Sequence, residues 1–482
     1  MALKVYNTSS REMEVFEPLQ KGKIGMYVCG PTTYDLSHMG HARAYVAFDV
    51  IRRYLENIGY DVTYVQNFTD VDDKIIARSK ERGIPPLEFA QLYVDEYFKD
   101  MDMLGIMRAT HHPYASKTID DMIALVKGLI EKGFAYNVKG NVYFSIYKAL
   151  DKVGQLTHQS LDEMLDGARV EINPEKDHPK DFALWKRAKE GEISWDSPWG
   201  PGRPGWHIEC STMSMKFIGE TLDIHGGGQD LIFPHHESEI LQSECFTGKK
   251  FCRYWLHNGF VRIDNEKMSK SLGNFFTIRE VLKKYSPAVV RFFFLYTHYR
   301  QPIDYSGEHL EEAKRSLERI QTAIINVERY LNPEIGGGEA PNSESNIVRE
   351  AKKARDKFRE SMDEDFNTRR AIAAIFELTR EINRAVLERI NKGSIRSAFI
   401  IYCDMLGILG LSIEMIKNSQ SLGAADEEST LETGLIELLI ELRKELRKEK
   451  QWALSDTIRD KLKEMGVILE DTNNGTVFKR IR

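Results

Sequence analysis

Apolar runs alternate with amphipathic stretches in the N-terminal part of the chain. The runs Gly25–Cys29 and Asp61–Val65 read as strands, Ala42–Asn57 has helical periodicity, and further helical stretches begin at Asp73. Strands that alternate with helices in this way indicate βαβ units and a parallel sheet. A ligand of such a sheet binds at the carboxyl ends of the strands. We therefore predict an α/β fold with its binding site at that edge.

The pattern of predicted elements and the composition change over residues 118–203. This segment predicts a helix, then a hairpin near Asn137–Ile146, then a stretch rich in tryptophan, proline and glycine. The sheet resumes near Leu222. We interpret 118–203 as an insertion that divides the strands of the sheet between two parts of the sequence.

The second half of the chain has mostly helical periodicity. Residues 277–332 and 342–417 show few strand signals, and the glycine-rich segment 335–341 between them has the composition of a linker. A second polar linker is expected at 418–430, followed by a last unit over 431–482. In this unit the pattern predicts a helix and a short hairpin.

Size and charge limit the class of protein. A chain of 482 residues exceeds what one core usually supports, so about two to four domains are expected. The 67 basic and 73 acidic residues give a net charge of −6, so any nucleic-acid interface must be a local basic face.

Two segments are candidates for such a basic face, namely Arg443–Lys450 and Lys479–Arg482. Glu441, Glu445 and Glu449 interleave with the run, however, and a solvated helix with i,i+4 ion pairs explains it as well.

The cysteines and the N-terminal residues indicate the cellular compartment of the protein. The five cysteines have no repeated spacing, which argues against a disulfide framework and for a reducing compartment. We interpret Cys245, Cys252 and Cys403 as structural. Met1–Ser10 lacks the apolar core of a signal peptide, and nowhere is there an uncharged apolar run of about 18 residues. We expect a cytoplasmic protein without membrane contact.

Two short signatures suggest an ATP site. His38-Met39-Gly40-His41 lies between a predicted strand and a predicted helix, where backbone N–H groups and the helix dipole favour a phosphate. Lys267-Met268-Ser269-Lys270-Ser271 is a loop whose lysines could stabilise charge that develops on a triphosphate. No Gly-x-x-x-x-Gly-Lys-Ser/Thr pattern is present, so a P-loop is excluded.

Four further residues have side chains that suit a metal ion. They are Cys29, Cys210, His235 and Glu239. The last two are four apart, so on a helix they share one face. Thiolate, imidazole and carboxylate together suit zinc better than magnesium or calcium. Buried apolar cysteines and a histidine that caps a helix would explain the same residues without a metal.

The order of the two signatures in a chain of this length resembles the class I aminoacyl-tRNA synthetases. Their HIGH and KMSKS motifs match, with Met39 in place of the usual Ile. Within this class the likeness is to the cysteinyl-tRNA synthetase family and covers nearly the whole chain. The stretches that carry it are Tyr27–His41, Gly205–Met213, His225–Glu239 and Lys267–Asn274.

This resemblance implies a class I Rossmann-like nucleotide-binding fold with a connective insertion, followed by a helical bundle and a small C-terminal α/β unit. Asp363–Thr368 is similar to the start of the anticodon-binding bundle. Arg369 stands where the family has Pro, which leaves only the first helical turn open because Pro at N1 is favourable but not required. The implied boundaries are 1–117 and 204–276 for the catalytic domain, 118–203 for the connective insertion, 277–332 for a helical connecting region, 342–417 for the bundle and 431–482 for an anticodon-contacting domain.

The resemblance also implies site residues and ligands. The zinc ligands of the family map onto Cys29, Cys210, His235 and Glu239, and the sulfur of the substrate L-cysteine completes the coordination. Zinc distinguishes a thiol from the hydroxyl of serine, which an apolar pocket alone cannot reject strongly. Trp206 would form a wall beside the substrate, unless it is an ordinary core tryptophan.

ATP with Mg²⁺ and tRNA(Cys) are the other implied partners, and we expect a monomer. Thr69 and Asp230 would contact the adenylate, with a turn or capping role as the alternative for both. The residues implied for ATP binding and catalysis are His38, Gly40, His41, Lys267 and Lys270.

Three other functions are weighed against this one. A cysteine ligase that transfers the adenylate to an aminosugar would share both sites but resemble only the first two thirds of the chain. A paralogue that binds tRNA without catalysis would be expected to lose its signatures, but both histidines and both lysines are present. A zinc hydrolase of the His-Glu-x-x-His type is disfavoured because that motif is missing.

Overall fold

The computed structural model describes residues 2–160, 163, 174–263, 266–267, 275–332, 345–420, 424–472 and 475–480. The chain separates into two units, Met1–Ser419 and Gln420–Arg482. The domain boundaries expected inside the first unit stay predictions.

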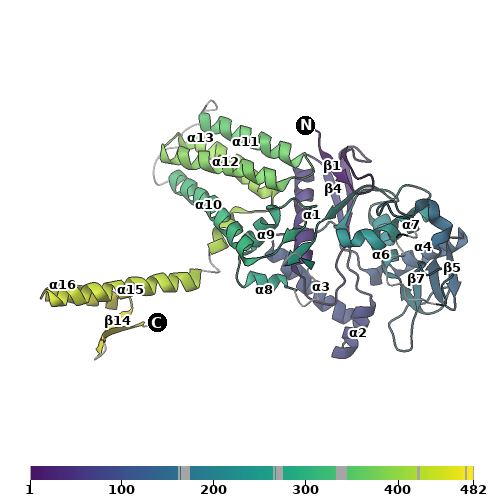
Figure 1. Cartoon of the computed structure of the whole chain (residues 1–482), viewed down its shortest axis with the longest axis horizontal. Coiled ribbons are helices and arrows are strands. Elements are labelled where there is room, and N and C mark those ends of the chain that lie inside the picture. Colours follow the sequence, from purple (N-terminus) through teal and green to yellow (C-terminus); the bar gives the residue numbers. More distant parts are fainter. Residues whose placement is uncertain are drawn as a thin grey trace. The chain divides into compact units, whose positions relative to one another are not determined.

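A parallel four-stranded sheet organises the first unit, in the order β10-β9-β3-β4 (Figure 1). Most residues of each strand are buried, as expected where other elements cover both faces of a sheet. The predicted α/β fold with a parallel sheet is therefore confirmed. The strands and the helix that follows the first of them are β3 (Lys23–Val28), α1 (Met39–Asn57), β4 (Asp61–Gln66), β9 (Leu222–Gly228) and β10 (Cys252–Asn258).

The two faces of the sheet belong to two different hydrophobic cores. Successive side chains of a strand point to opposite faces. Met26 and Val28 accordingly join a core shared with α1 and the helical bundle. Tyr27 and Cys29 join a second core shared with the insertion. Because side chains along β3 alternate between the two faces, Cys29 lies on the face that packs against the insertion.

The insertion contains a helix and a small antiparallel sheet, in the order β5-β6-β7-β8. The predicted hairpin is confirmed as β5 and β6, whereas β7 and β8 were not predicted because their residues lie in the Trp/Pro/Gly-rich stretch. Trp185 of β7 is fully buried in the second core. The elements on this side of the sheet are α4 (Ile119–Glu131), β5 (Ala135–Val138), β6 (Asn141–Phe144), β7 (Phe182–Arg187), β8 (Gly202–Pro204), α6 (Trp206–Phe217) and α7 (Glu237–Thr247).

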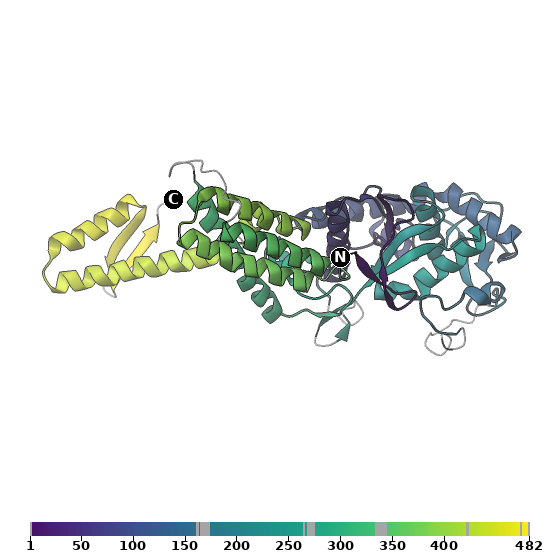
Figure 2. The same cartoon turned by 90° about the horizontal axis from the view of Figure 1, so that it is seen from above.

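A bundle of helices packs on the other side, as Figures 1 and 2 both show. Its fourth helix begins at Thr368, where Asn367 accepts a hydrogen bond from the N–H of Arg370 at 3.2 Å. Arg369 therefore does not prevent the first turn. The helices are α9 (Pro287–Leu295), α10 (Gly307–Leu331), α11 (Asn346–Met362), α12 (Thr368–Leu387), α13 (Lys392–Ile408) and α14 (Ile413–Lys417).

The segment Asp363–Thr368 connects the bundle to the N-terminal hairpin and to α1. Lys4, in the N-terminal hairpin of β1 (Lys4–Asn7) and β2 (Glu12–Val15), donates its N–H to the carbonyl of Asp363 at 2.8 Å. The Tyr54 hydroxyl of α1 donates to the Asp363 carboxylate at 2.6 Å. The Thr368 hydroxyl donates to the carbonyl of Leu295 at 2.8 Å. The N-terminal hairpin, α1 and α9 thereby hold the start of α12.

The second unit contains the predicted helix and hairpin, and a further helix precedes them. Its elements are α15 (Ala424–Lys448), α16 (Trp452–Glu464), β14 (Val467–Thr472) and β15 (Gly475–Arg480). The expected linker 418–430 is wrong in its second half, because α15 already begins at Ala424. Arg443 is 3% exposed, so it does not contribute to a basic surface as the sequence suggested.

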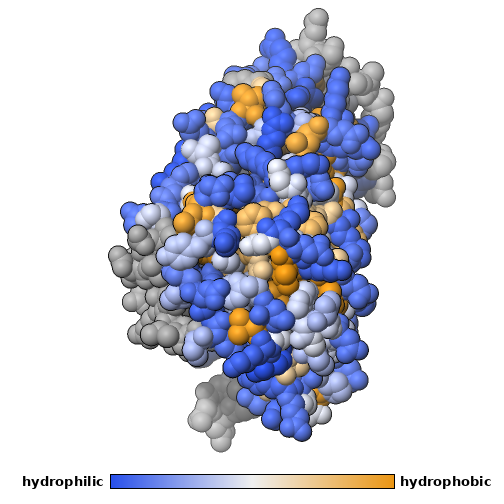
Figure 3. Space-filling view, turned by 90° about the vertical axis from the view of Figure 1, so that its right-hand side faces the viewer, coloured by the Kyte–Doolittle hydropathy of each residue, from blue (hydrophilic) through white to orange (hydrophobic). Residues whose placement is uncertain are grey.

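The face of the molecule on the side of α4 and α7 is mostly hydrophilic, with hydrophobic side chains in scattered patches (Figure 3). Among the described residues, no helix is both long and apolar enough to span a bilayer.

A buried ion pair links α1 to α9 and the bundle. Arg291 is fully buried, and its guanidinium pairs with the Asp49 carboxylate. It also donates to the carbonyls of Leu409 at 2.7 Å and Leu104 at 3.2 Å. Burial alone would raise the pKa of Asp49, but Arg291 and Arg53 outweigh it and hold the pKa below its usual value. The pair therefore ties α1 and α9 to the C-terminal ends of two further helices, α3 (Pro86–Met103) and α13.

We predict that Arg291→Met lowers the free energy of unfolding by about 3 kcal/mol or more, because it leaves the Asp49 carboxylate buried without its main partner. Urea denaturation of the whole chain measures the change. As a control, Lys417→Met removes an exposed pair with Glu328, whose side chains are 42% and 41% exposed, and should cost no more than about 1 kcal/mol. Equal losses in the two variants would contradict the prediction.

Candidate active site

A cavity of about 280 Å³ opens at the carboxyl edge of the parallel sheet. It lies where β3, β9 and β10 end, which is the edge predicted from the alternation of strands and helices. A larger groove of about 510 Å³ between α9, α10 and α12 contains none of the predicted site residues. The predicted residues that line the smaller cavity are Cys29, His38, Gly40, His41, Trp206 and Asp230.

His38 and His41 form the beginning of α1. His38 is the N-cap: its Nδ1 accepts from the N–H of His41 at 3.2 Å, and Nδ1 of His41 accepts from the N–H of His38 at 3.4 Å. The two rings stack with their centroids 3.7 Å apart. Met39 is fully buried, which explains why another apolar residue replaces the usual Ile of the family motif. The helix thus begins three residues earlier than predicted.

The residues next to the lysine signature are bonded to this same helix start. The N–H of Met39 donates to the carbonyl of Phe276 at 3.2 Å, and the N–H of Ile278 donates to the carbonyl of Ser37 at 3.1 Å. On the other side, β12 (Glu266–Lys267) pairs with β11 (Val261–Ile263), and Val261 lines the cavity. Described residues on both sides of the lysine signature therefore lie at the start of α1 and near the cavity. Lys270 and the side chain of Lys267 lie outside the described residues.

The four candidate metal ligands converge beside the cavity. Their donor atoms all lie within 4.8 Å of one another, and all four residues are buried. Cys29 follows β3, and His235 lies in the helical turn Ile232–His236 before α7. Cys210 and Glu239 are contributed by α6 and α7. One strand end, one turn and two helices thus bring together residues spread over much of the chain.

The separations of these atoms suit a tetrahedral zinc ion. Bonds of about 2.3 Å to sulfur and about 2.0 Å to nitrogen or oxygen would place two sulfurs about 3.8 Å apart, sulfur and oxygen about 3.5 Å apart, and nitrogen and oxygen about 3.3 Å apart. The Cys29 and Cys210 sulfurs are 3.7 Å apart. Glu239 Oε1 lies 3.6 Å from the Cys29 sulfur and 3.1 Å from His235 Nε2. The donor set and its spacing both fit the ion.

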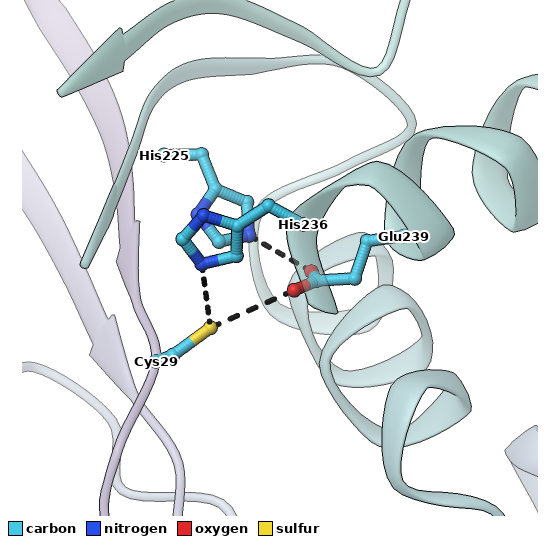
Figure 4. Close-up of side chains that lie close together, drawn as sticks. All are labelled: Cys29, His225, His236 and Glu239. Atoms are coloured by element: carbon cyan, nitrogen blue, oxygen red, sulfur yellow. Dashed lines mark hydrogen bonds and ion pairs between the residues drawn. The ribbon is translucent and has the colours of Figure 1, made fainter. Parts of the chain in front are cut away.

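A second layer of histidines surrounds the cluster. His225 donates from Nε2 to Glu239 Oε2 at 2.8 Å, and Nε2 of His236 lies 3.3 Å from the Cys29 sulfur (Figure 4). These two histidines form an alternative ligand set with Cys29 and Glu239. The set with Cys210 supplies a second thiolate and is the softer one, which suits zinc better.

Burial determines the protonation of the cluster. It raises the pKa of the Cys29 thiol, to which Cys210 adds, and raises the pKa of the Glu239 carboxyl. It lowers the pKa of the His235 imidazole well below its usual value. All three shifts favour the neutral forms, because charge is poorly solvated there. A bound cation would reverse the first two by stabilising the anions.

The three predicted substrate contacts differ in exposure. Trp206 is 39% exposed, and its ring lies 4.3 Å from that of His235, so it is not an ordinary core tryptophan. Asp230 is exposed at the cavity. Thr69 is buried, and its backbone N–H donates to the carbonyl of Pro31 in the cavity wall at 3.2 Å.

Sequence reasoning missed the partners of the ligands. His207 and His235 meet through their Nδ1 atoms at 2.9 Å, and His257 lies 2.8 Å from His236. Asn67 accepts the N–H of Gly30 at 2.8 Å. His207 and His236 stand in the stretches that resemble the family, but nothing in the sequence distinguishes a partner from a ligand.

Family comparisons agree with this geometry. The family "tRNA synthetases class I (C) catalytic domain" matches residues 15–315, and the "DALR domain" matches residues 357–414. Among solved structures, a LeuRS ternary complex from Agrobacterium radiobacter superposes with a TM-score of 0.61 at 13% identity, covering 84% of this chain and 86% of that one. A Mycobacterium tuberculosis methionyl-tRNA synthetase gives 0.58 at 16% identity, covering 83% and 92%. The fold is that of the class I tRNA synthetases, and the chain is an aminoacyl-tRNA ligase.

Relatives narrow the class further. A protein named "Cysteine--tRNA ligase" from Carboxydothermus hydrogenoformans is 51% identical, over 99% of this chain and 100% of the relative. One of the same name from Heliobacterium modesticaldum is 50% identical over the whole of both chains. This chain belongs to the cysteine-tRNA ligase family.

We predict that Gly30→Ala destabilises the protein by about 3 kcal/mol, because a Cβ there would lie 1.6 Å from the carbonyl oxygen of Asn67 and force the two backbones apart. The thermal unfolding midpoint measures the loss. Gly407→Ala in α13 is the matched control, since no atom lies within 4 Å of its added Cβ, and it should be neutral or stabilising by up to about 1 kcal/mol. A Gly30→Ala protein as stable as the control would contradict the close approach.

Proposed function

We propose that this chain joins L-cysteine to the 3′ end of tRNA(Cys) in two steps. The cysteine carboxylate attacks the α-phosphate of ATP to give cysteinyl-adenylate and diphosphate. The terminal ribose of the tRNA then takes the aminoacyl group and releases AMP. One observation carries the proposal: a soft metal-ligand cluster lies beside the cavity of about 280 Å³ that Cys29 and the start of α1 line.

Cys29, Cys210, His235 and Glu239 are the proposed ligands of one zinc ion. When bound, the ion would take the sulfur of the substrate as a ligand and favour its thiolate, which the hydroxyl of serine imitates poorly. Selection at this point needs no hydrolytic editing site. Trp206, beside His235, closes the cavity next to the position that the substrate would occupy.

The surrounding histidines orient the proposed ligands. His225 occupies Oε2 of Glu239, which leaves Oε1 directed at Cys29 and His235. His207 engages Nδ1 of His235, which leaves its Nε2 directed at the cluster. Such partners fix the rotamer and the tautomer of a ligand before a metal arrives.

His38, Gly40 and His41 are proposed to hold the phosphates of ATP at the N-terminus of α1. Backbone N–H groups and the helix dipole favour an anion there. Lys267 and Lys270 would bind the departing diphosphate, and Mg²⁺ would accompany ATP. The catalytic contribution of these groups is positioning and electrostatic stabilisation, without a covalent intermediate on the protein.

The helical half of the chain favours tRNA over the rival acceptor. An aminosugar ligase would resemble only the first two thirds, whereas this chain continues through a DALR match at 357–414 and a further unit from Gln420. A catalytically inactive paralogue is disfavoured because His38, His41, Lys267 and Lys270 are all retained. We further propose that the enzyme acts as a cytoplasmic monomer and that the second unit contacts the anticodon.

The reaction is tested by two measurements on the purified chain. Cysteine should drive exchange of labelled diphosphate into ATP, and serine should not. The activated cysteine should then transfer to tRNA(Cys) and not to an aminosugar. Transfer to the sugar alone would favour the rival ligase, and binding of tRNA without exchange would favour the inactive paralogue.

Two substitutions test the metal ligands. Cys29→Ser and His235→Ala should lower bound zinc well below one ion per chain, measured by elemental analysis, because each removes one of four ligands. Both should abolish cysteine-dependent exchange while ATP binding persists.

Cys252→Ser is the control for these variants. Cys252 is also buried in the second core but donates its S–H to the carbonyl of Tyr254 at 3.2 Å, so the variant should keep zinc and exchange. Full zinc content and full exchange in Cys29→Ser would overturn the metal proposal.

A further inference from the structure

Arg43 is a buried cation that the proposed reaction does not yet use. It lies on α1, two residues after His41, and is 2% exposed. Burial lowers the pKa of its guanidinium to about 9, so the side chain remains charged at neutral pH. Within the described ranges, no carboxylate forms an ion pair with it. A buried charge without such a partner is costly unless hydrogen bonds compensate it.

Backbone carbonyls take the place of an acidic partner. The guanidinium of Arg43 donates to the carbonyl of Phe294 and, at 2.8 Å, to that of His298. Longer contacts of 3.3 or 3.4 Å reach the carbonyls of Thr297, Tyr299 and Gln301. These groups lie at and after the C-terminal end of α9, where unpaired carbonyls and the helix dipole favour a cation. Arg43 thereby holds the stretch that follows α9, which we name the 297–302 segment.

The turn after β10 is bonded to this segment. The N–H of Gly259 donates to the carbonyl of Tyr299 at 2.8 Å. Directly after the segment, the N–H of Ile303 donates to the carbonyl of Phe260 at 2.9 Å. Gly259 and Phe260 form the turn between β10 and β11, and both line the cavity. Backbone hydrogen bonds therefore attach one wall of the cavity to the 297–302 segment.

Gly259 and the 297–302 segment are also in close contact. A Cβ on Gly259 would lie 2.4 Å from both the carbonyl carbon and the carbonyl oxygen of Gln301, and 2.6 Å from the nitrogen of Pro302. These three nearest atoms all belong to the segment, so the added atom would point at the segment. Backbones packed this closely cannot be displaced independently. A shift of the segment therefore shifts the turn with it.

Two walls of the cavity thus depend on one side chain. Gly40 and His41, in the first turn of α1, line one wall. Arg43 extends from the next residues of this helix and holds the segment on which Gly259 and Phe260 of the other wall are packed. The side chain itself is not among the described residues that line the cavity. Its effect on a bound molecule is therefore indirect.

We propose that Arg43 is a positioning residue for ATP, which sets the separation between the start of α1 and the turn after β10. This inference rests on the proposed function, because it requires that ATP binds in this cavity. It also accounts for an arginine at this position. A lysine ends in a compact ammonium group without the planar fork that reaches carbonyls on both sides of the end of α9.

Binding of ATP to Arg43→Met tests the proposal. Methionine is long and unbranched, so it fills much of the same volume without any donor. Equilibrium dialysis of the full chain with Mg²⁺ and ATP gives the Kd without turnover. This Kd should rise about tenfold or more, because the two walls no longer keep their separation. The KM for cysteine in diphosphate exchange at saturating ATP should change less than about twofold, because the metal-ligand cluster does not contact Arg43.

Arg291→Met is the matched control for a general loss of stability. Arg291 is also buried and also donates to carbonyls, but those of Leu104 and Leu409 are not among the described groups at the cavity. This variant should be less stable than the wild type, whereas its Kd for ATP should change less than about twofold.

Two milder variants keep the proposal testable if Arg43→Met does not fold. Arg43→Lys keeps the charge and part of the carbonyl contacts, so its Kd for ATP should lie between those of the wild type and Arg43→Met. Gly259→Ala pushes on the same segment from the other side and should also raise this Kd. Combined, Arg43→Lys and Gly259→Ala should raise the Kd by less than the product of the two separate factors, because both act through the 297–302 segment.

Three outcomes would overturn the inference while the proposed function stood. They are an unchanged Kd for ATP in Arg43→Met and Gly259→Ala, an equal weakening of ATP and cysteine in Arg43→Met, and a rise of the Kd in Arg291→Met as large as that in Arg43→Met. A wild-type chain that binds no ATP would overturn the proposed function, and this inference with it.

Discussion

Desolvation is the constraint on which the rest of the site depends. Cys29, Cys210, His235 and Glu239 are all buried, and burial disfavours the charged forms of Cys29, His235 and Glu239. Such a cluster is stable as a set of neutral groups or as anions around a cation. Histidines behind the cluster contact Glu239, His235 and Cys29, so that the proposed zinc ion would need little reorganisation of these side chains. These buried polar groups therefore contribute little to the free energy of folding when no cation is bound.

The sequence predicted the parts of this enzyme that depend on local pattern. Alternating apolar runs indicated the parallel sheet and its binding edge, although α1 begins three residues before the predicted Ala42. Local pattern could not predict that the four candidate metal ligands lie close together in space. The positions of Cys29 and Cys210 in the sequence do not indicate that their sulfurs lie 3.7 Å apart. This distance arises because α6 and the end of β3 pack into the same core. The likeness to a known family supplied what local pattern lacked.

Residues with purely tertiary roles were the least predictable. Arg291 and Asp49 lie on helices that any periodicity analysis finds, yet their pairing becomes visible only when those helices are packed. His207 and Asn67 look like ordinary polar residues until their neighbours are known. Where prediction failed in secondary structure, at β7, β8 and the start of α15, the local residues carry turn signals or polarity that tertiary packing overrides.

The strict alternation along β3 has an evolutionary consequence. Met26 and Val28 face the bundle, whereas Tyr27 and Cys29 face the insertion, so the two faces of one strand pack against different parts of the chain. Loss or gain of a single residue within this strand would exchange those neighbours all at once and turn the thiol away from its ligand partners. Lineages of this protein should therefore tolerate length changes in the surrounding loops but almost none between Lys23 and Val28.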